Sequence, residues 1–288
     1  MIHVQKSFAK ETGMLYLVPT PIGNLEDMTF RAIRILKEVD YIACEDTRNT
    51  KKLCNHFDIT TPLLSYHEHN KMEAGAKIIA LLQKGHTLAV VSDAGMPAIS
   101  DPGFELVNDC IEKQIPVVPL PGANAALTAF IASGMPNEHF YYYGFLSRYE
   151  KERKKELQSL QHIDVPLIFY EAPHRLKEML QSMYRVFGNR AIVVSRELTK
   201  RYEEFIRGSL EEIVNQFETV TVKGEFCIIV EGNQEEMNET QWWEALSVIG
   251  HVQHYVEKGE SSKEAIKKVA KEREMPKREV YQTYHGLS

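Results

Sequence analysis

The sequence predicts an α/β protein with mostly parallel sheets covered by helices, followed by a small, purely helical C-terminal region. Short apolar segments alternate with stretches of helical periodicity over residues 14–232, and this order is typical of parallel sheets. The length of 288 residues corresponds to about two domains. A polar Gln/Glu-rich segment at 233–239 is typical of a linker, and only helical periodicity comes after it.

The first half of the chain is predicted to alternate between strands and helices. Ile33, Ile35 and Leu36, for example, lie among Arg and Lys residues at helical spacing. The strands are expected at 15–19, 40–44, 87–92 and 116–119, and the helices at 29–39, 74–83 and 104–113.

A second, similar alternation follows, and the tail then contains helices alone. The later strands are expected at 140–145, 166–170, 191–195 and 225–231, the later helices at 124–132, 149–160, 175–187 and 210–217, and the tail helices at 240–258, 262–274 and 277–285. Trp242 and Trp243 are expected to anchor the tail helices by packing onto them or onto the rest of the protein.

The composition excludes several classes of protein. The formal net charge of -6 argues against a protein that coats nucleic acid non-specifically, although an RNA substrate requires only a local basic patch. Residues 261–288 carry such an excess of basic side chains. No apolar run approaches the ~20 residues that span a membrane, and no signal peptide is expected. The cysteines are widely spaced without a C-x-x-C pair, so we expect a cytoplasmic protein with no disulfide framework and no metal site.

Common nucleotide-binding motifs are missing, but four other loops indicate a ligand site. The chain contains neither G-x-G-x-x-G nor G-x-x-x-x-G-K-[ST]. Instead, loops rich in Gly, Pro and Asp follow predicted strands at 18–24, 44–48, 92–103 and 120–124. Ligands of open α/β sheets bind outside the carboxyl ends of the strands, where such loops converge. Ordinary turn chemistry is the alternative explanation for any one of these loops.

Eight collinear segments resemble the tetrapyrrole (corrin/porphyrin) methylase superfamily, and most closely its branch that methylates 16S ribosomal RNA. The segments are PTPIGNLEDMTFRA (19–32), ACEDTR (43–48), SDAGMPAISDPG (92–103), PGANAALTAFIASG (121–134), GFLSR (144–148), FYEAPHR (169–175), SRELTK (195–200) and GEFCIIVEG (224–232). Ser147 departs from the pattern, because the family usually has Pro at this position. The helical tail also resembles the helix-turn-helix-like region of that branch.

The resemblance implies a two-lobed tetrapyrrole-methylase-like fold with parallel and mixed sheets. The implied division is an N-terminal extension (1–13), an N-terminal α/β lobe (14–123), a C-terminal α/β lobe (124–232) and a helical tail (233–288). The implied reaction transfers a methyl group from S-adenosylmethionine to the 2'-hydroxyl of a cytidine in the decoding region of 16S rRNA. The implied partners are the small ribosomal subunit and a second copy of the chain in a homodimer, with neither DNA nor a membrane.

The resemblance also places the cofactor in the cleft between the lobes. The residues carried over as cofactor contacts are Pro21, Ile22, Ala94, Gly95, Met96, Ile99, Asn124, Ala125, Glu171, Ala172 and Leu198. The loops around Pro21, Met96 and Asn124 contain no Lys or Arg, which suits a sulfonium cation.

The ribose hydroxyl must lose its proton during the reaction, so a base is expected near the cofactor. The candidate catalytic residues are Glu45, Asp46, Asp101, Glu171 and Lys200, the last either as a base with a lowered pKa or as an oxyanion stabiliser. The candidate RNA contacts are Arg48, Arg148, Arg175, Arg196, Lys200 and Arg201. Structural ion pairs, such as Arg48 with Asp46 or Arg196 with Glu197, are the alternative explanation for these cations.

The aromatic residues of the second lobe leave alternatives open. Tyr141, Tyr142, Tyr143 and Phe145 offer rings for stacking an unpaired base, but alternation along a strand predicts that half of them belong to the core. Phe169 and Tyr170 are expected in the core.

Two competing functions remain: a methylase of the same superfamily that acts on a porphyrinoid or a protein, and a non-catalytic ribosome assembly factor.

Overall fold

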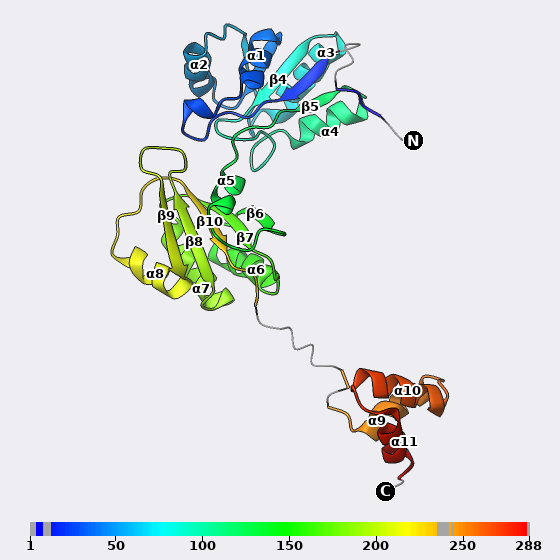
Figure 1. The fold of residues 1–288 in the computed structure, drawn as a ribbon. Helices are drawn as coiled ribbons and strands as arrows, with labels where there is room; N and C mark the ends of the chain where they lie inside the picture. The colour runs from blue at the N-terminus through cyan, green and yellow to red at the C-terminus, as the bar shows by residue number, and fades with distance from the viewer. Residues whose placement is uncertain (1–3, 8–12, 235–241, 244, 287–288) are drawn as a thin grey trace. The chain divides into compact units, whose positions relative to one another are not determined.

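The computed structural model describes residues 4–7, 13–234, 242–243 and 245–286. The chain divides into two compact units, Met1–Asn233 and Gln234–Ser288. The larger unit contains two five-stranded sheets, and the smaller one contains only helices among its described residues (Figure 1). Most of the segment predicted as a linker, at 235–239, lies outside the described residues.

The first sheet is entirely parallel, with the strand order β3-β2-β4-β1-β5. Its strands are β1 (Met14–Leu17), β2 (Tyr41–Cys44), β3 (Leu63–Ser65), β4 (Thr87–Val91) and β5 (Val117–Pro119). Its connections contain the short 3-10 helix η1 (Leu25–Asp27) and the helices α1 (Phe30–Glu38), α2 (Thr47–His56), α3 (Lys71–Gln83) and α4 (Phe104–Glu112). A parallel arrangement brings the carboxyl ends of all five strands to one edge, where the strand-end loops meet.

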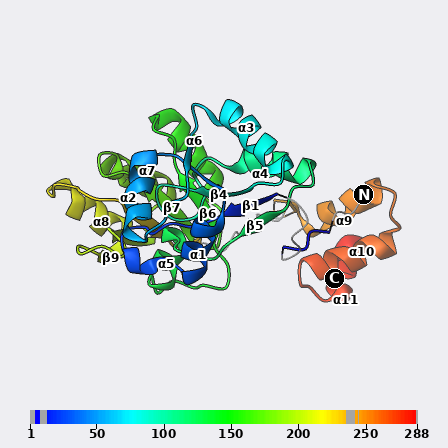
Figure 2. The ribbon, with the colours of Figure 1, turned by 90° about the horizontal axis from the view of Figure 1, so that it is seen from above.

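Alternating residues of these strands contribute to two cores, one on each face of the sheet. Ala89 and Val91 pack with α1 and α2, whereas Leu88 and Val90 pack with α3 and α4. Figure 2 shows α1 and α2 on one side of β1, β4 and β5, with α3 and α4 on the other. Burial on both faces explains why these strands are continuous apolar runs.

The second sheet is mixed, with the order β6-β7-β10-β8-β9. Its strands are β6 (Tyr141–Phe145), β7 (Leu167–Glu171), β8 (Ala191–Arg196), β9 (Glu204–Ser209) and β10 (Phe226–Val230). β10 is antiparallel to both of its neighbours, and β9 is antiparallel to β8. One face packs against α6 (Glu150–Leu160), α7 (Leu176–Phe187) and α8 (Leu210–Glu218), and the other face packs against α5 (Ala125–Ile131).

Three elements differ from the sequence-based expectation. The sequence analysis did not predict α2, β3 or β9, because Thr47–His56 is mostly polar and the two strands lie at sheet edges with few buried side chains. The side chain of Asp46 starts α2 by accepting a hydrogen bond from the Arg48 amide (2.8 Å). The Asp46 cap thus fixes the start of α2, a helix with few apolar residues in its sequence.

The smaller unit contains α9 (Val248–Glu257), α10 (Ser262–Glu272) and α11 (Lys277–His285) around a core that includes Val252, Ile266 and Val280. The prediction that the first tail helix begins at 240 is wrong, because Ser247 caps α9 by accepting from the Gly250 amide (3.1 Å). Trp243 does anchor the tail: its ring stacks on His251, with the ring centroids 5.2 Å apart.

Candidate active site

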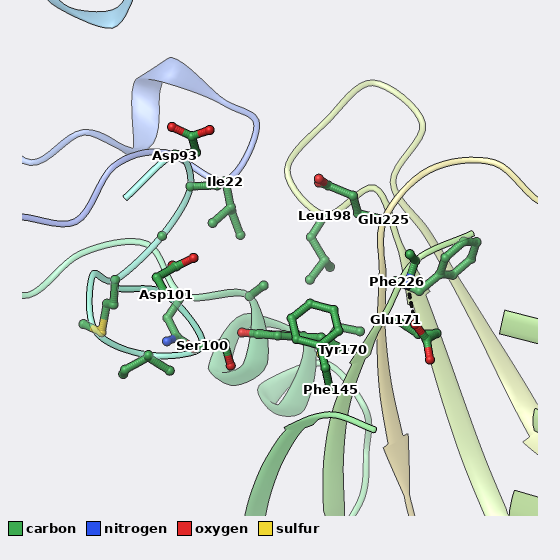
Figure 3. A pocket seen from close by; sticks show the side chains of 18 of the residues that line it. Ile22, Asp93, Ser100, Asp101, Phe145, Tyr170, Glu171, Leu198, Glu225 and Phe226 are labelled. Carbon is green, nitrogen blue, oxygen red and sulfur yellow. Dashed lines mark hydrogen bonds between the residues drawn. The ribbon is translucent and has the colours of Figure 1, made fainter. Parts of the chain in front are cut away.

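A cavity of about 450 Å³ opens at the carboxyl edge of the first sheet and is closed on its other side by the second sheet. This volume lies in the usual range for a small-molecule site. Figure 3 shows its lining, with Ile22, Asp93 and Asp101 on one side and Tyr170, Glu171 and Phe226 on the other. The cavity therefore lies between the two α/β lobes.

The N-terminal lobe supplies its wall from the loops after β1 and β4. Thr20 and Gly95 exchange backbone hydrogen bonds of 2.9 and 3.0 Å, which join these two loops. Gly95 has a φ of +80°, a conformation that side chains with a Cβ rarely adopt. This junction fixes Ile22 beside the segment 93–101, so both reach the cavity.

The connection between the lobes adds the start of α5 to the lining. Asn124 caps this helix by accepting a hydrogen bond from the Leu127 amide (3.0 Å). The hydroxyl of Tyr170 accepts a hydrogen bond from the Ala126 amide (2.9 Å) and so attaches the helix start to β7. Asn124, Ala125 and Tyr170 all line the cavity as a result.

A side-chain hydrogen bond joins the two lobes beside the cavity. The hydroxyls of Ser100, in the loop after β4, and Tyr142, in β6, lie 2.6 Å apart. A Cβ at Gly144 would come within 3.0 Å of the Ser100 hydroxyl, so this close approach requires glycine. Ser100 itself has a φ of +60°, a strained conformation of the kind that is found at functional sites.

The predicted cofactor contacts are brought together with one exception. Pro21 lines a neighbouring cavity of about 230 Å³ instead, on the other side of the loop that carries Ile22. The remaining ten predicted residues all line the larger cavity: Ile22, Ala94, Gly95, Met96, Ile99, Asn124, Ala125, Glu171, Ala172 and Leu198.

The sequence analysis missed other residues of the lining, although each lies in or next to a quoted segment. Phe145 and Tyr170 are aromatic walls of the cavity; Tyr170 also packs against the core, as expected, and Phe169 is fully buried. Tyr143 packs against the core, as alternation along β6 predicts. Phe145 was named as a ring for stacking a base, and the residues that were missed are Asp93, Ser100, Tyr170, Pro173, Glu225, Phe226 and Cys227.

The cavity lining contains carboxylates but neither Lys nor Arg. Burial, followed by the nearby charges of Glu45 and Asp93, raises the pKa of Asp101 to about 6. Burial, together with the charge of Asp93, also raises the pKa of Glu45. Glu45 does not itself line the cavity. Asp101 is therefore a carboxylate that is in contact with the cavity and titrates near neutral pH, as a general base must.

Asp46 is a helix cap and is poorly suited to act as a base. Its hydrogen bonds from the Arg48 side chain and amide lower its pKa to about 2. A carboxylate with so low a pKa has little tendency to take a proton. Asp46 also lies outside the lining of both cavities.

Glu171 reaches the lining, but its side chain is fully buried. Its Oε1 accepts a hydrogen bond from the Ala172 amide (2.8 Å) and lies 3.2 Å from Arg175 Nε in an ion pair. Burial raises the pKa of Glu171, and the Ala172 hydrogen bond and the Arg175 charge oppose that rise. The carboxylate thus fixes the loop 171–175 through its Oε1, while its Oε2 is buried without a hydrogen-bond partner among the described residues.

Lys200 is ion-paired twice, with Glu197 Oε1 at 3.0 Å and Glu225 Oε2 at 2.7 Å. Burial lowers its pKa, but the hydrogen bonds to Glu225 and Glu197 outweigh burial, so the pKa is raised overall. This raised pKa does not favour the alternative in which Lys200 is a base with a lowered pKa. Lys200 also packs on the loop after β1, because a Cβ at Gly23 would overlap its side chain.

Some of the predicted RNA-binding cations form hydrogen bonds or ion pairs within the protein, and others are exposed to solvent. Arg175 donates to the Leu146 carbonyl (2.5 Å), and Arg196 donates to the Lys223 carbonyl (2.7 Å). Arg196 pairs with Glu204 rather than Glu197, whereas the alternative pair of Arg48 with Asp46 is present. Arg148 and Arg201 are exposed, and within the described part of the chain they contact only aromatic neighbours, Tyr149 and Tyr202.

Comparison with known proteins identifies the family. The family described as Tetrapyrrole (Corrin/Porphyrin) Methylases matches residues 14–214. A protein of Bacillus subtilis named Ribosomal RNA small subunit methyltransferase I is 58% identical over 289 residues, which cover 99% of each chain. A protein of the same name from Halalkalibacterium halodurans is 59% identical over 276 residues and covers 96% of each chain. The chain belongs to the tetrapyrrole methylase family.

The fold of this methylase agrees with solved structures of the family. The uroporphyrin-III C-methyltransferase of Thermus thermophilus, solved in complex with S-adenyl homocysteine, superposes with a TM-score of 0.54 at 19% identity. The match covers 75% of the methylase and 97% of the Thermus chain. The family takes its methyl group from S-adenosylmethionine. In the described parts of the methylase, no helix is long and apolar enough to cross a membrane, and no three His, Cys, Asp or Glu side chains form a cluster suited to a metal ion.

Proposed function

We propose that this methylase transfers a methyl group from S-adenosylmethionine to the 2'-hydroxyl of a cytidine in the decoding region of 16S rRNA. The substrate class rests on the relatives that are named ribosomal RNA small subunit methyltransferase I. The choice of the cytidine 2'-hydroxyl rests on the resemblance of the eight sequence segments to that branch. The structural observation that carries the chemistry is a cation-free cavity that contains Asp101.

The residues of the larger cavity fit the cofactor. When bound, S-adenosylmethionine supplies an electrophilic methyl group on a positively charged sulfur. Ile22, Met96 and Leu198 provide apolar walls, and the absence of Lys and Arg from the lining avoids repulsion of that charge. The carboxylates Asp93 and Asp101 add a favourable negative potential.

Asp101 is the proposed general base. Its pKa of about 6 keeps it ionised at neutral pH but still able to accept a proton. Asp101 would accept the proton of the ribose hydroxyl, and the bound cofactor would supply the methyl group to the ribose oxygen. The burial of Asp101 among other carboxylates is what gives it this basicity, since Glu45 and Asp93 disfavour its ionised form.

Cations near the loops of the C-terminal lobe would hold the RNA backbone. Arg148 and Arg201 are exposed and carry no ion pair in the described structure. Phosphate contacts of this kind position an RNA without reading its sequence. The proposed substrate particle is the small ribosomal subunit, and the proposed assembly is a homodimer, both on the basis of the resemblance.

A methyl-transfer assay tests the proposal. The purified protein is incubated with S-adenosylmethionine labelled in its methyl group and with either unmodified small subunits or naked 16S rRNA, and the digested nucleosides are identified by mass. We expect label in 2'-O-methylcytidine. Label on a base would overturn the 2'-hydroxyl assignment, and label in a porphyrinoid or protein substrate but not in RNA would overturn the substrate class. A failure to bind the cofactor would favour the non-catalytic assembly factor.

A further inference from the structure

The smaller cavity, of about 230 Å³, shares a wall with the larger one. Asp93 lines both, and the consecutive residues Pro21 and Ile22 line one cavity each. A methyltransferase needs two adjoining sites, because donor and acceptor must be held in contact and in line. The residues that line the smaller cavity are Thr20, Pro21, Gly23, Leu25, Asn49, Thr50, Lys52, Leu53, Ser92 and Asp93.

The hydrogen-bond pattern orients the amide of Asn49. Asp93 Oδ1 accepts from the Asp46 amide (3.2 Å), and its Oδ2 accepts from Asn49 Nδ2 (3.2 Å). An ionised carboxylate has no proton to donate, so the amide nitrogen of Asn49 must face Asp93. The amide oxygen of Asn49 is thereby left as an acceptor for another group.

The hydroxyls of Thr20 and Ser92 do not donate to a ligand. Thr20 Oγ1 donates its proton to the Ser92 carbonyl (3.0 Å), and Ser92 Oγ donates to the Gly95 carbonyl (3.2 Å). Both side chains are buried, and a hydroxyl has a single proton to donate. The exposed acceptors of the lining are therefore those of Asp93 and Asn49, and they favour a ligand that brings donors.

The remaining lining combines apolar surface with one cation. Pro21, Leu25 and Leu53 provide apolar contacts, and Leu25 is 41% exposed. Lys52 is exposed and forms no ion pair within the described residues. Apolar walls suit the face of a base, and an exposed lysine suits a phosphate.

We propose that the smaller cavity holds the acceptor nucleotide of the RNA and selects a base that carries an exocyclic amine. This inference rests on the proposed function, for which it supplies the acceptor site. Cytosine and adenine each present an amine donor, whereas uracil presents a carbonyl oxygen at the equivalent position. A uracil carbonyl facing Asn49 Oδ1 and Asp93 would leave acceptors opposed, so the acceptor-rich lining discriminates against uridine.

The first test fills the cavity without touching the cofactor site. Leu25→Trp enlarges an exposed side chain of the smaller cavity, and Ile111→Trp is the matched control, an exposed apolar residue of α4 that lines neither cavity. We expect Leu25→Trp to keep the calorimetric affinity for S-adenosylhomocysteine and to lose about 10²-fold in methyl transfer to small subunits, because the acceptor is displaced. Wild-type transfer, or a parallel loss of cofactor affinity, would overturn the proposal.

A second pair of variants tests the cation. Lys52→Ala is expected to raise the KM for small subunits several-fold with little change in kcat, because a phosphate contact positions the RNA. Lys51→Ala removes an equally exposed charge one residue away and outside the lining, and is expected to behave as wild type. Equal effects of the two substitutions would show that general charge, and not this cavity, determines the KM.

A binding measurement separates this proposal from the proposed function. Cytidine 5'-monophosphate and uridine 5'-monophosphate are titrated into protein with labelled leucine methyls in the presence of S-adenosylhomocysteine. We expect the cytidine nucleotide to shift the Leu25 and Leu53 signals at lower concentration than the uridine nucleotide. Equal binding, or no shift, would overturn the proposal. If this preference is seen but no RNA is methylated, the smaller cavity is a nucleotide-binding site and the proposed reaction is wrong.

Discussion

The two lobes use the charged residues at their strand ends in opposite ways. In the N-terminal lobe, Asp93 and Asp101 face the cavity, and no ion pair is found for either within the described residues. In the C-terminal lobe, Glu171 pairs with Arg175, and Glu197 and Glu225 pair with Lys200. Burial and neighbouring carboxylates raise the pKa of Asp101, whereas the hydrogen bond from the Glu225 amide and the Lys200 charge lower that of Glu197. At Glu171, burial outweighs the charge of Arg175, and the pKa is raised. The first lobe is therefore equipped for proton transfer, and the second for holding its loops in place.

Replacement of the proposed base is expected to have the largest effect. Asp101→Asn should lower kcat about 10²–10⁴-fold, because it removes general-base assistance. Asp109→Asn, on α4 and outside both cavities, is the control and should leave the rate unchanged. Single-turnover transfer with saturating cofactor measures the effect. A near-normal rate for Asp101→Asn would remove the functional distinction between the lobes.

The ion pair between Glu171 and Arg175 in the C-terminal lobe should contribute chiefly to the stability of the fold. Glu171→Ala leaves Arg175, whose side chain is 23% exposed, without its buried partner. We expect a loss of about 3 kcal/mol in the free energy of unfolding, measured by urea denaturation. Glu152→Ala, which removes an exposed carboxylate of α6 that forms no ion pair within the described residues, is the control and should cost far less. Unchanged stability of Glu171→Ala would contradict a holding role.

The pH dependence of the rate sharpens the comparison further. Asp101 must be ionised to accept a proton, so the rate should rise with pH through about 6 and then level off. Glu45→Gln removes a neighbouring negative charge that raises the Asp101 pKa, so the midpoint should move to lower pH. A midpoint that moves upwards, or one that persists in Asp101→Asn, would assign the titration to another group.

The smallest effect is expected at Lys200. Its two ion pairs are partly exposed, with Glu225 78% exposed, so Lys200→Met should cost about 1 kcal/mol or less in unfolding free energy. Because the pKa of Lys200 is raised, the wild-type rate should show no step from this residue between pH 7 and about 9. A large loss of kcat in Lys200→Met, with the pH profile altered, would give this lysine a direct part in the reaction.

Much of the fold follows from local patterns in the sequence. Buried parallel strands such as Leu88–Val91 are apolar on both faces, and amphipathic helices such as Phe30–Glu38 show their core stripe, so both are evident from the residues. Elements with weaker patterns were missed: α2 depends on the Asp46 cap, and β9 pairs only at a sheet edge. Three of the four strand-end loops identified by their Gly, Pro and Asp content, 18–24, 92–103 and 120–124, do reach the larger cavity, whereas 44–48 contributes no residue to its lining.

The sequence by itself determined the alternation of strands and helices, the loops that carry the site and the family resemblance. Only the tertiary structure decided which charged residues are free to act. Arg175 is committed to the carbonyl of Leu146, and Lys200 to the carboxylate of Glu225, across 29 and 25 positions of the chain. Burial, followed by the charges of Glu45, on the loop after β2, and of Asp93, on its own loop, raises the pKa of Asp101. Basicity depends on burial and on neighbours in space, and these are set by how the strands are ordered in the sheet.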